Sequence, residues 1–184
     1  MRVHAETSAA DALPKNAERE EMQVTIGESS LGLVLIAQGA KGVIAVLLGD
    51  DGDTLRRDLE SRFPDAMLTD RDAKLDERTA EVIRFVESPE HSINAPLDMR
   101  GSEFQRKVWQ ALREIPAGKT ASYTDVANRI GRPRSVRAVA AACAANHLAV
   151  VVPCHRVVRS DGQLAGYRWG VERKRTLLHR EAVA

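Results

Sequence analysis

Residues 122–146 read SYTDVANRIGRPRSVRAVAAACAAN, and this stretch decides the fold of the C-terminal half of the chain. Ser122 followed three residues later by Asp125 is typical of a helix N-terminus, and the GRPR run interrupts the helical pattern. A second helix is expected from Ser135, as its cap, to about Asn146. Two helices joined by a tight turn that contains glycine predict a helix-turn-helix.

The second helix of this motif has two different faces. Its apolar face consists of Val136, Val139, Ala140 and Cys143, so Cys143 is expected in the core. Its opposite face consists of Arg137, Ala138, Ala141 and Ala145. Small side chains allow a partner surface to come close to the backbone, and one projecting arginine suggests contact along a nucleic-acid groove. The alternative is that the alanines only favour helix formation and pack within the chain.

A possible nucleophile follows this helix, in the run Val150-Val151-Val152-Pro153-Cys154-His155-Arg156-Val157-Val158. A cysteine is a good nucleophile only as thiolate, and His155 is a neighbouring base that could take the thiol proton. A free cysteine is often just a small buried hydrophobe, so the run by itself leaves both interpretations open.

The last part of the chain adds a turn and a helix. The dipeptide Asp161-Gly162 predicts a hairpin turn between residues 157–159 and 163–165. The final helix is expected over residues 171–181, with Glu181 on the same face as its two leucines. A carboxylate on a buried face needs a partner, and His155 is available.

The N-terminal half has a different pattern. Residues 1–21 have no apolar period and are expected to form a disordered tail. Three β-type runs predict a three-stranded antiparallel meander, namely VTI at 24–26, LVLI at 33–36 and VIAVLL at 43–48. Helices are expected at about 53–63 and 74–87, and Ser102 begins another with a capping box. Prolines at 89 and 96 divide the chain into an N-terminal domain, 22–92, and a C-terminal domain, 93–184.

The composition narrows the class of protein. Residues 1–96 hold 11 Lys/Arg and 19 Asp/Glu, a net charge of −8, whereas residues 97–184 hold 16 and 7, a net charge of +9. This asymmetry suggests nucleic acid as a partner of the second half, or attraction between the halves. No apolar run reaches the roughly 20 residues of a membrane span, so an intracellular protein is expected. Two cysteines are too few for a disulfide scaffold or a four-cysteine zinc site.

The whole pattern resembles the O6-alkylguanine-DNA alkyltransferases. The resemblance rests on the PCHRV run at 153–157, with Asn146 and Arg137 upstream of it, and it extends from about Gln23 to Glu181. It is strongest with the bacterial adaptive-response branch, through LLGDD at 47–51, RGSEFQ at 100–105, VRAVA at 136–140 and GYRWG at 166–170. It implies an α+β fold, with a ribonuclease-H-like N-terminal domain and a winged helix-turn-helix-like DNA-binding domain.

The resemblance implies an alkyl transfer in which the protein is consumed. Cys154 would attack the carbon on guanine O6, and on thymine O4, and keep the alkyl group as a thioether. His155, acting through a water and oriented by Glu181, would take the thiol proton. Tyr123 would donate a proton or hydrogen bond to the leaving guanine, and Asn146 would bridge the active-site turn to the helix-turn-helix. Neither a metal nor a cofactor is implied.

The resemblance also implies how DNA is bound. Arg137 would enter the base stack of a duplex that carries O6-alkylguanine, because a thiolate cannot reach a base that stays inside the duplex. The remaining DNA contacts would be Ser135, Arg134, Ala138 and Ala141. The flipped base would lie against Tyr167, Arg168, Val157 and Cys143. A monomer in the bacterial cytoplasm, without membrane contact, is expected.

Three other functions fit parts of the pattern. A helix-turn-helix in a basic region is also typical of a transcription regulator without enzymatic activity. A cysteine hydrolase would use Cys154 and His155, but the base of such enzymes usually comes from far along the chain. A zinc site made of Cys143, Cys154, His155 and His179 has spacings that fit no common pattern. Transfer of a methyl group from a duplex to Cys154 would separate the alkyltransferase from all three.

Overall fold

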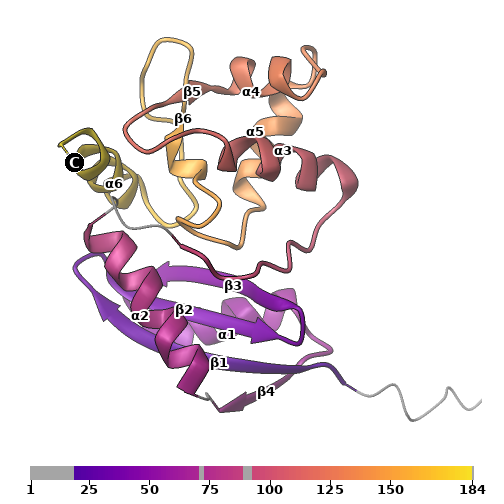
Figure 1. Ribbon diagram of the computed structural model, residues 1–184. Helices are drawn as coiled ribbons and strands as arrows, with labels where there is room; N and C mark the ends of the chain where they lie inside the picture. Colours follow the sequence, from indigo (N-terminus) through magenta and orange to yellow (C-terminus); the bar gives the residue numbers. More distant parts are fainter. Residues whose placement is uncertain (1–18, 71–72, 89–92, 184) are drawn as a thin grey trace, which may run out of the picture.

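The computed structural model describes residues 19–70, 73–88 and 93–183. A sheet with two helices forms the N-terminal half, and a group of helices and loops forms the C-terminal half (Figure 1). The predicted α+β fold class is confirmed. The predicted tail lies mostly outside the described residues, although strand β1 already begins at Glu21. The domain boundary at residues 92 and 93 stays a prediction.

The three predicted strands form an antiparallel meander, and the two predicted helices pack on it. The strands are β1 (Glu21–Ser29), β2 (Gly32–Gly39) and β3 (Gly42–Gly49), and the helices are α1 (Gly52–Arg62) and α2 (Ala73–Glu87). Every residue from Gly42 to Leu48 is buried, which is typical of a strand covered on both faces. In Figure 1 α1 and α2 lie on opposite faces of the sheet, where α1 packs on β2 and β3, and α2 packs on β1 and β2.

The sheet has a fourth strand that the sequence did not indicate. β4 (Met67–Asp70) pairs in parallel with the first residues of β1, and the strand order is β3-β2-β1-β4. The expectation of a three-stranded antiparallel sheet is therefore wrong. A strand of four residues is too short to show the alternation of apolar and polar side chains that identifies longer strands. Its pairing partner, β1, lies far away in the sequence.

Short helices dominate the C-terminal half, as predicted. They are α3 (Glu103–Arg113), α4 (Tyr123–Arg129), α5 (Val136–Ala144), a single 3₁₀ turn (Cys154–Arg156) and α6 (Val171–Val183). Ser102 and Ser122 each form a capping box. Ser135 stands at the N-cap position of α5 but makes no capping hydrogen bond, and α5 ends two residues before Asn146. The helix-turn-helix is thus present, with a second helix shorter than expected.

The segment after the 3₁₀ turn does not form the predicted hairpin. β6 (Val157–Val158) pairs in parallel with β5 (Ala121–Ser122), which directly precedes α4. The predicted turn itself is present, since Arg159 N donates to Gln163 O at 3.0 Å and Gly162 has a φ of 78°. The predicted pairing of residues 157–159 with residues 163–165 is wrong, because the strand that pairs with β6 is β5.

Strand β3 joins the two halves of the molecule. Val46 N donates to His147 O at 2.8 Å, and Ala149 N donates to Val46 O at 2.9 Å. Val43 pairs in the same way with Leu97, in the segment that connects the halves. The N-terminal sheet therefore fixes the backbone that leads from α5 toward Cys154.

Candidate active site

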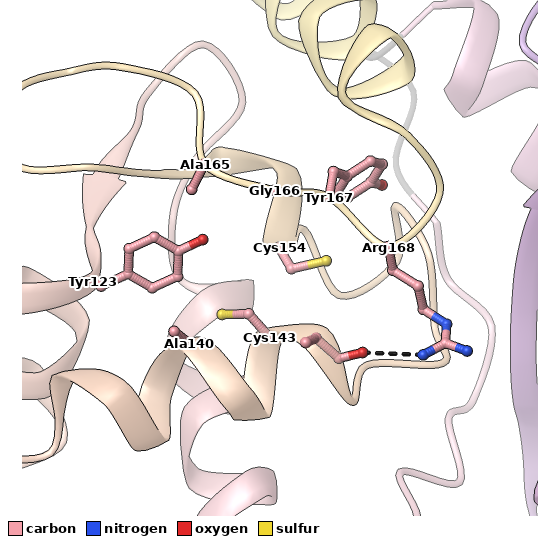
Figure 2. Close-up of a pocket in the computed structure, with 9 residues that line it drawn as sticks. Tyr123, Ala140, Cys143, Cys154, Ala165, Gly166, Tyr167 and Arg168 are labelled. Carbon is pink, nitrogen blue, oxygen red and sulfur yellow. Dashed lines mark hydrogen bonds between the residues drawn. The ribbon is translucent and has the colours of Figure 1, made fainter.

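Cys154 lines a cavity of about 480 Å³ between α5 and the loop at residues 165–168. α5 contributes Ala140, Cys143 and Ala144, and Tyr123 projects from the start of α4. Figure 2 shows the loop and α5 on opposite sides of the cavity. The lining residues are mostly small or apolar, so the cavity is suited to a ligand group that makes few polar contacts.

The backbone before Cys154 is tightly folded. Val150 has a φ of 60°, which is rare for a β-branched residue, and Val151 N donates to Ala149 O across it at 2.6 Å. Such a conformation persists only where the surrounding structure imposes it. The pairing of β3 with residues 147–149 provides one constraint, and the side chain of Asn146 provides another.

Asn146 connects the end of α5 to the turn that carries the thiol. It is fully buried, and its Oδ1 accepts a hydrogen bond from Leu148 N at 2.9 Å. Its Nδ2 donates to Val152 O at 2.9 Å and contacts Cys154 Sγ at 3.2 Å. One amide thus fixes the turn and donates to the sulfur.

A buried cluster of His155, Arg156 and Glu181 adjoins the cysteine. His155 Nε2 lies 2.7 Å from Glu181 Oε1, and Arg156 donates to both carboxylate oxygens at 2.9 Å. Arg156 Nη1 also donates to Ile115 O at 2.5 Å. Burial by itself would raise the pKa of Glu181, but the hydrogen bonds from His155 and Arg156 outweigh it and lower this pKa to about 2. The carboxylate is therefore ionised and accepts the Nε2–H of His155.

This pairing leaves the other ring nitrogen of His155 available. Burial lowers the pKa of His155 below its ordinary value, against the opposing effect of Glu181. The imidazole is therefore neutral at pH 7, with its proton on Nε2. Nδ1 is buried and makes no hydrogen bond to the described residues. Its lone pair can accept a proton.

The thiol of Cys154 is protonated at neutral pH in this state. Burial raises the pKa of Cys154 to about 11, although the hydrogen bond from Asn146 and the charge of Lys174 act in the opposite direction. Lys174 is fully buried, and its Nζ donates to Val157 O at 2.5 Å. Its ammonium group forms no ion pair with a carboxylate of the described residues. The site thus holds a positive charge that could stabilise a thiolate.

Sequence reasoning missed Arg156 and Lys174, although each left a signal. Arg156 follows Cys154-His155 directly in the quoted run. Lys174 precedes Glu181 by seven residues, so the two lie on one face of a helix. A lysine on a buried face requires a partner as much as Glu181 does.

The side chains expected around a flipped base differ in how far they are buried. Burial, together with the two cysteines, raises the pKa of Tyr123 to about 12, so the phenol keeps its proton. Tyr167 is half-buried, and its buried hydroxyl makes no hydrogen bond to the described residues. Burial raises the pKa of Cys143 to about 12, which leaves it an apolar part of the lining. Val157 does not line the cavity. Its N–H donates to Cys154 O, and its carbonyl accepts a hydrogen bond from Lys174.

The expected DNA-contacting residues lie together at the surface. Arg134, Arg137, Ala138 and Ala141 are exposed, and Ser135 is half-buried. In the part of the chain that the structure describes, neither arginine makes an ion pair or a side-chain hydrogen bond. Two unpaired guanidinium groups beside small side chains are suited to a phosphate backbone.

Residues 19–70, 73–88 and 93–183 contain neither a cluster of metal ligands nor a membrane-spanning helix. No three His, Cys, Asp or Glu side chains converge there as metal ligands. The alternative zinc set is not assembled, since His179 is exposed on α6 while Cys154 and His155 are buried. No helix in these ranges has the length and apolar character needed to cross a membrane.

Comparison with known proteins gives the same family throughout. The family model described as "6-O-methylguanine DNA methyltransferase, DNA binding domain" matches residues 103–183. The chain is 41% identical over 149 residues to the inducible methylated-DNA–protein-cysteine methyltransferase of Bacillus subtilis, covering 79% of this chain and 82% of that protein. It is 49% identical over 165 residues to the bifunctional transcriptional activator/DNA repair enzyme Ada of Escherichia coli, covering 90% of this chain. That match spans only 47% of Ada, about half its length.

Two solved structures superimpose on most of the chain. The crystal structure of Mycobacterium tuberculosis O6-methylguanine methyltransferase superimposes with a TM-score of 0.73 at 29% identity, covering 88% of this chain and 93% of that one. The crystal structure of the Mycobacterium tuberculosis protein in complex with DNA gives a TM-score of 0.72 at 29% identity, covering 89% and 93%.

Proposed function

The chain belongs to the 6-O-methylguanine DNA methyltransferase family, and we propose that it repairs DNA by moving an alkyl group to Cys154. The group comes from O6 of guanine, and from O4 of thymine, in double-stranded DNA. The observation that carries the proposal is the position of Cys154, which lines the cavity beside a neutral His155 that is hydrogen-bonded to the ionised Glu181. The protein acts as a monomer in the bacterial cytoplasm.

The proposed reaction is a displacement at the alkyl carbon. His155 Nδ1 takes the thiol proton through a water, and the Cys154 thiolate attacks. The new S–C bond forms as the C–O bond breaks, and the electron pair remains on guanine O6. Tyr123, whose phenol keeps its proton, protonates the departing base and is reprotonated from His155. The thioether has no ready route back to thiol, so each molecule acts once.

The high thiol pKa explains why a base is needed. With a pKa of about 11, very little Cys154 is ionised at pH 7. An adjacent imidazole with a free lone pair is the usual means of activating such a nucleophile. Glu181 keeps the His155 ring in the tautomer that leaves Nδ1 unprotonated and stabilises the imidazolium once it forms. The Lys174 ammonium stabilises the thiolate.

DNA approaches along the exposed face of α5. The target nucleotide must leave the duplex, at a cost of a few kcal/mol. Arg137 enters the base stack and offsets part of this cost, while Arg134, Ser135, Ala138 and Ala141 follow the groove. The flipped base reaches the cavity between α5 and the loop, where Tyr167, Arg168 and Cys143 are neighbours. Its alkyl group then faces Cys154.

The test is an intact-mass measurement. The protein is incubated with a duplex that contains one O6-methylguanine, and peptide mapping locates any added mass. We expect one methyl group per molecule, on Cys154, with no second turnover when more substrate is added. Cys143→Ala is the matched control and should still accept the methyl group. No gain in mass, or a gain that persists in Cys154→Ala, would rule the proposal out.

A further inference from the structure

The loop that forms one wall of the cavity has little backbone support. Residues 164–168 belong to no helix or strand. In the described parts of the chain, their one backbone–backbone hydrogen bond runs from Gly170 N to Tyr167 O, at 3.0 Å. The position of this wall therefore depends on side chains.

One side chain of the loop spans three elements. Arg168 Nη1 donates to Ala144 O, at the end of α5, at 3.2 Å, and Figure 2 shows this bond beside the cavity. Arg168 Nη2 donates to Asp58 Oδ1 at 3.2 Å and to Oδ2 at 3.4 Å. Asp58 lies on α1 of the N-terminal half, 110 residues away in the sequence. Arg168 thus connects the loop, the DNA-facing helix and the N-terminal half.

The Asp58 carboxylate is itself held in place. Arg62, one turn along α1, donates from Nε and Nη2 to Asp58 Oδ1 at 3.2 Å each. The side chains of Asp58, Arg62 and Arg168 are 32%, 19% and 28% exposed, so water only partly screens the group. The carboxylate is therefore a fixed point to which Arg168 can attach.

The helix that follows the loop has its own attachments. Arg173 donates to Leu31 O at 2.7 Å, and Arg180 donates to Val86 O at 2.5 Å. These bonds hold α6, with Glu181 and Lys174, against the N-terminal half. Loss of the Asp58–Arg168 pair should therefore release the loop without moving the catalytic cluster.

We propose that Asp58 is a positioning residue for alkyl transfer, which holds the loop at 165–168 against α5 through Arg168 so that the cavity fits a flipped base. The inference rests on the proposed function, because the occupant of the cavity is the alkylated base. Asp58 touches neither DNA nor the reacting atoms. It acts through Arg168.

The test compares Asp58→Asn with Arg57→Gln, which disrupts the exposed ion pair between Arg57 and Asp51 at the start of α1. Single-turnover transfer from methylated duplex is measured at increasing protein concentration. For Asp58→Asn we expect the limiting rate to fall about two- to fivefold, as for a partly exposed ion pair, with unchanged affinity for unmethylated duplex. Arg57→Gln should transfer at the wild-type rate. Arg168→Gln, which also loses the bond to Ala144 O, should lose at least as much as Asp58→Asn, and the double variant should lose no more than Arg168→Gln alone.

Two further measurements separate positioning from general damage. Alkylation of Cys154 by iodoacetamide, a small probe that needs no fitted wall, should have the same rate in Asp58→Asn and wild type. Amide hydrogen exchange at residues 164–168 should be faster in Asp58→Asn and unchanged at residues 174–181. Wild-type transfer by Asp58→Asn, an equal loss in Arg57→Gln, or additive losses in the double variant would each overturn the inference. If wild type itself accepts no methyl group, the proposed function fails instead, and the exchange measurement still tests the attachment.

Discussion

Around the Cys154 thiol, single residues set the balance of charge. Glu181 and Arg156 neutralise each other, and His155 is neutral, so Lys174 remains as a positive charge without a carboxylate partner in the described residues. A thiolate on Cys154 would balance this charge. The alkylated product, a neutral thioether, would leave the buried ammonium without a counterion. Lys174 therefore offsets part of the cost that burial places on the Cys154 thiolate.

Replacing Lys174 by methionine tests this balance. Because the ammonium lowers the pKa of Cys154, Lys174→Met should raise that pKa further. The reactive species is the thiolate, so each tenfold drop in its population at pH 7 should slow methyl transfer about tenfold, and the rate should recover at higher pH. The rate is measured from pH 6 to the alkaline limit of folding. Arg175→Met, an exposed neighbour on α6, is the control. A loss of the same factor at every pH would mean that Lys174 contributes only to packing.

Among the helices, the N-cap serine forms a capping hydrogen bond in α3 but not in α5. Ser102 satisfies the N-terminus of α3 with a capping box, whereas Ser135 stands at the same position of α5 and caps nothing. The N-terminus of α5 thus keeps its amide groups available at the face where DNA is proposed to bind. Helix N-termini of this kind are suited to phosphate contacts.

The two serines make a matched pair for a stability measurement. Ser102→Ala should lower the free energy of unfolding by about 1 kcal/mol, because an amide donor loses its acceptor. Ser135→Ala should change it by less than about 0.5 kcal/mol, because it removes no hydrogen bond. Urea unfolding monitored by circular dichroism measures both. Equal losses would show that Ser135 caps α5 in solution.

The exposed face of α5 has its own prediction. Arg137→Ala should slow transfer from a methylated duplex by tenfold or more, because the wedge that replaces the flipped nucleotide is gone. Transfer from free O6-methylguanine, which requires no flipping, should change less than twofold. Both rates are followed by intact mass over time. Similar losses with the two substrates would refute the wedge role.

Across the whole molecule, the junction between the halves carries a buried histidine. His147 follows Asn146, pairs with β3 through its backbone, and packs edge-on against Phe63 and Trp109. Burial lowers the pKa of His147 to about 4. The halves therefore meet around an imidazole that stays neutral at pH 7, and protonation opposes their packing.

Acid should weaken this junction in a defined range of pH. The unfolded chain protonates His147 near pH 6.5, but the folded chain does so only near pH 4, so stability falls as the pH drops from 6.5 to 4. The contribution is at most about 3 kcal/mol. His147→Phe keeps an aromatic ring and should reduce the loss of unfolding free energy in this pH range. Urea unfolding at pH 7, 5.5 and 4.5 measures this loss. Below about pH 4.5 the unfolded chain also protonates Glu181, whose pKa in the folded chain is about 2, so both proteins lose further stability there. An unchanged slope between pH 6.5 and 4.5 would exclude His147 as the cause.

Much of this protein is determined by local sequence. The run VIAVLL at 43–48, rich in β-branched residues and flanked by glycines, favours a buried strand, and Ser102 and Ser122 specify where two helices begin. The PCHRV run, together with Asn146 and Arg137 at their spacings, is sufficient to indicate the family. These signals lie within single elements or at fixed spacings, which is why sequence alone conveys them.

The tertiary structure decided what depends on partners distant in the sequence. β4 exists because the edge of β1 is open to it, and β6 pairs with β5 instead of forming a hairpin. The contacts of Arg156 with Ile115 and Glu181, and of Arg168 with Asp58, join segments tens of residues apart. No local pattern encodes such contacts, because the energy of an ion pair or a strand pairing arises only when folding brings both partners together. The sequence therefore predicted which cysteine reacts, and the tertiary structure decided which groups surround it.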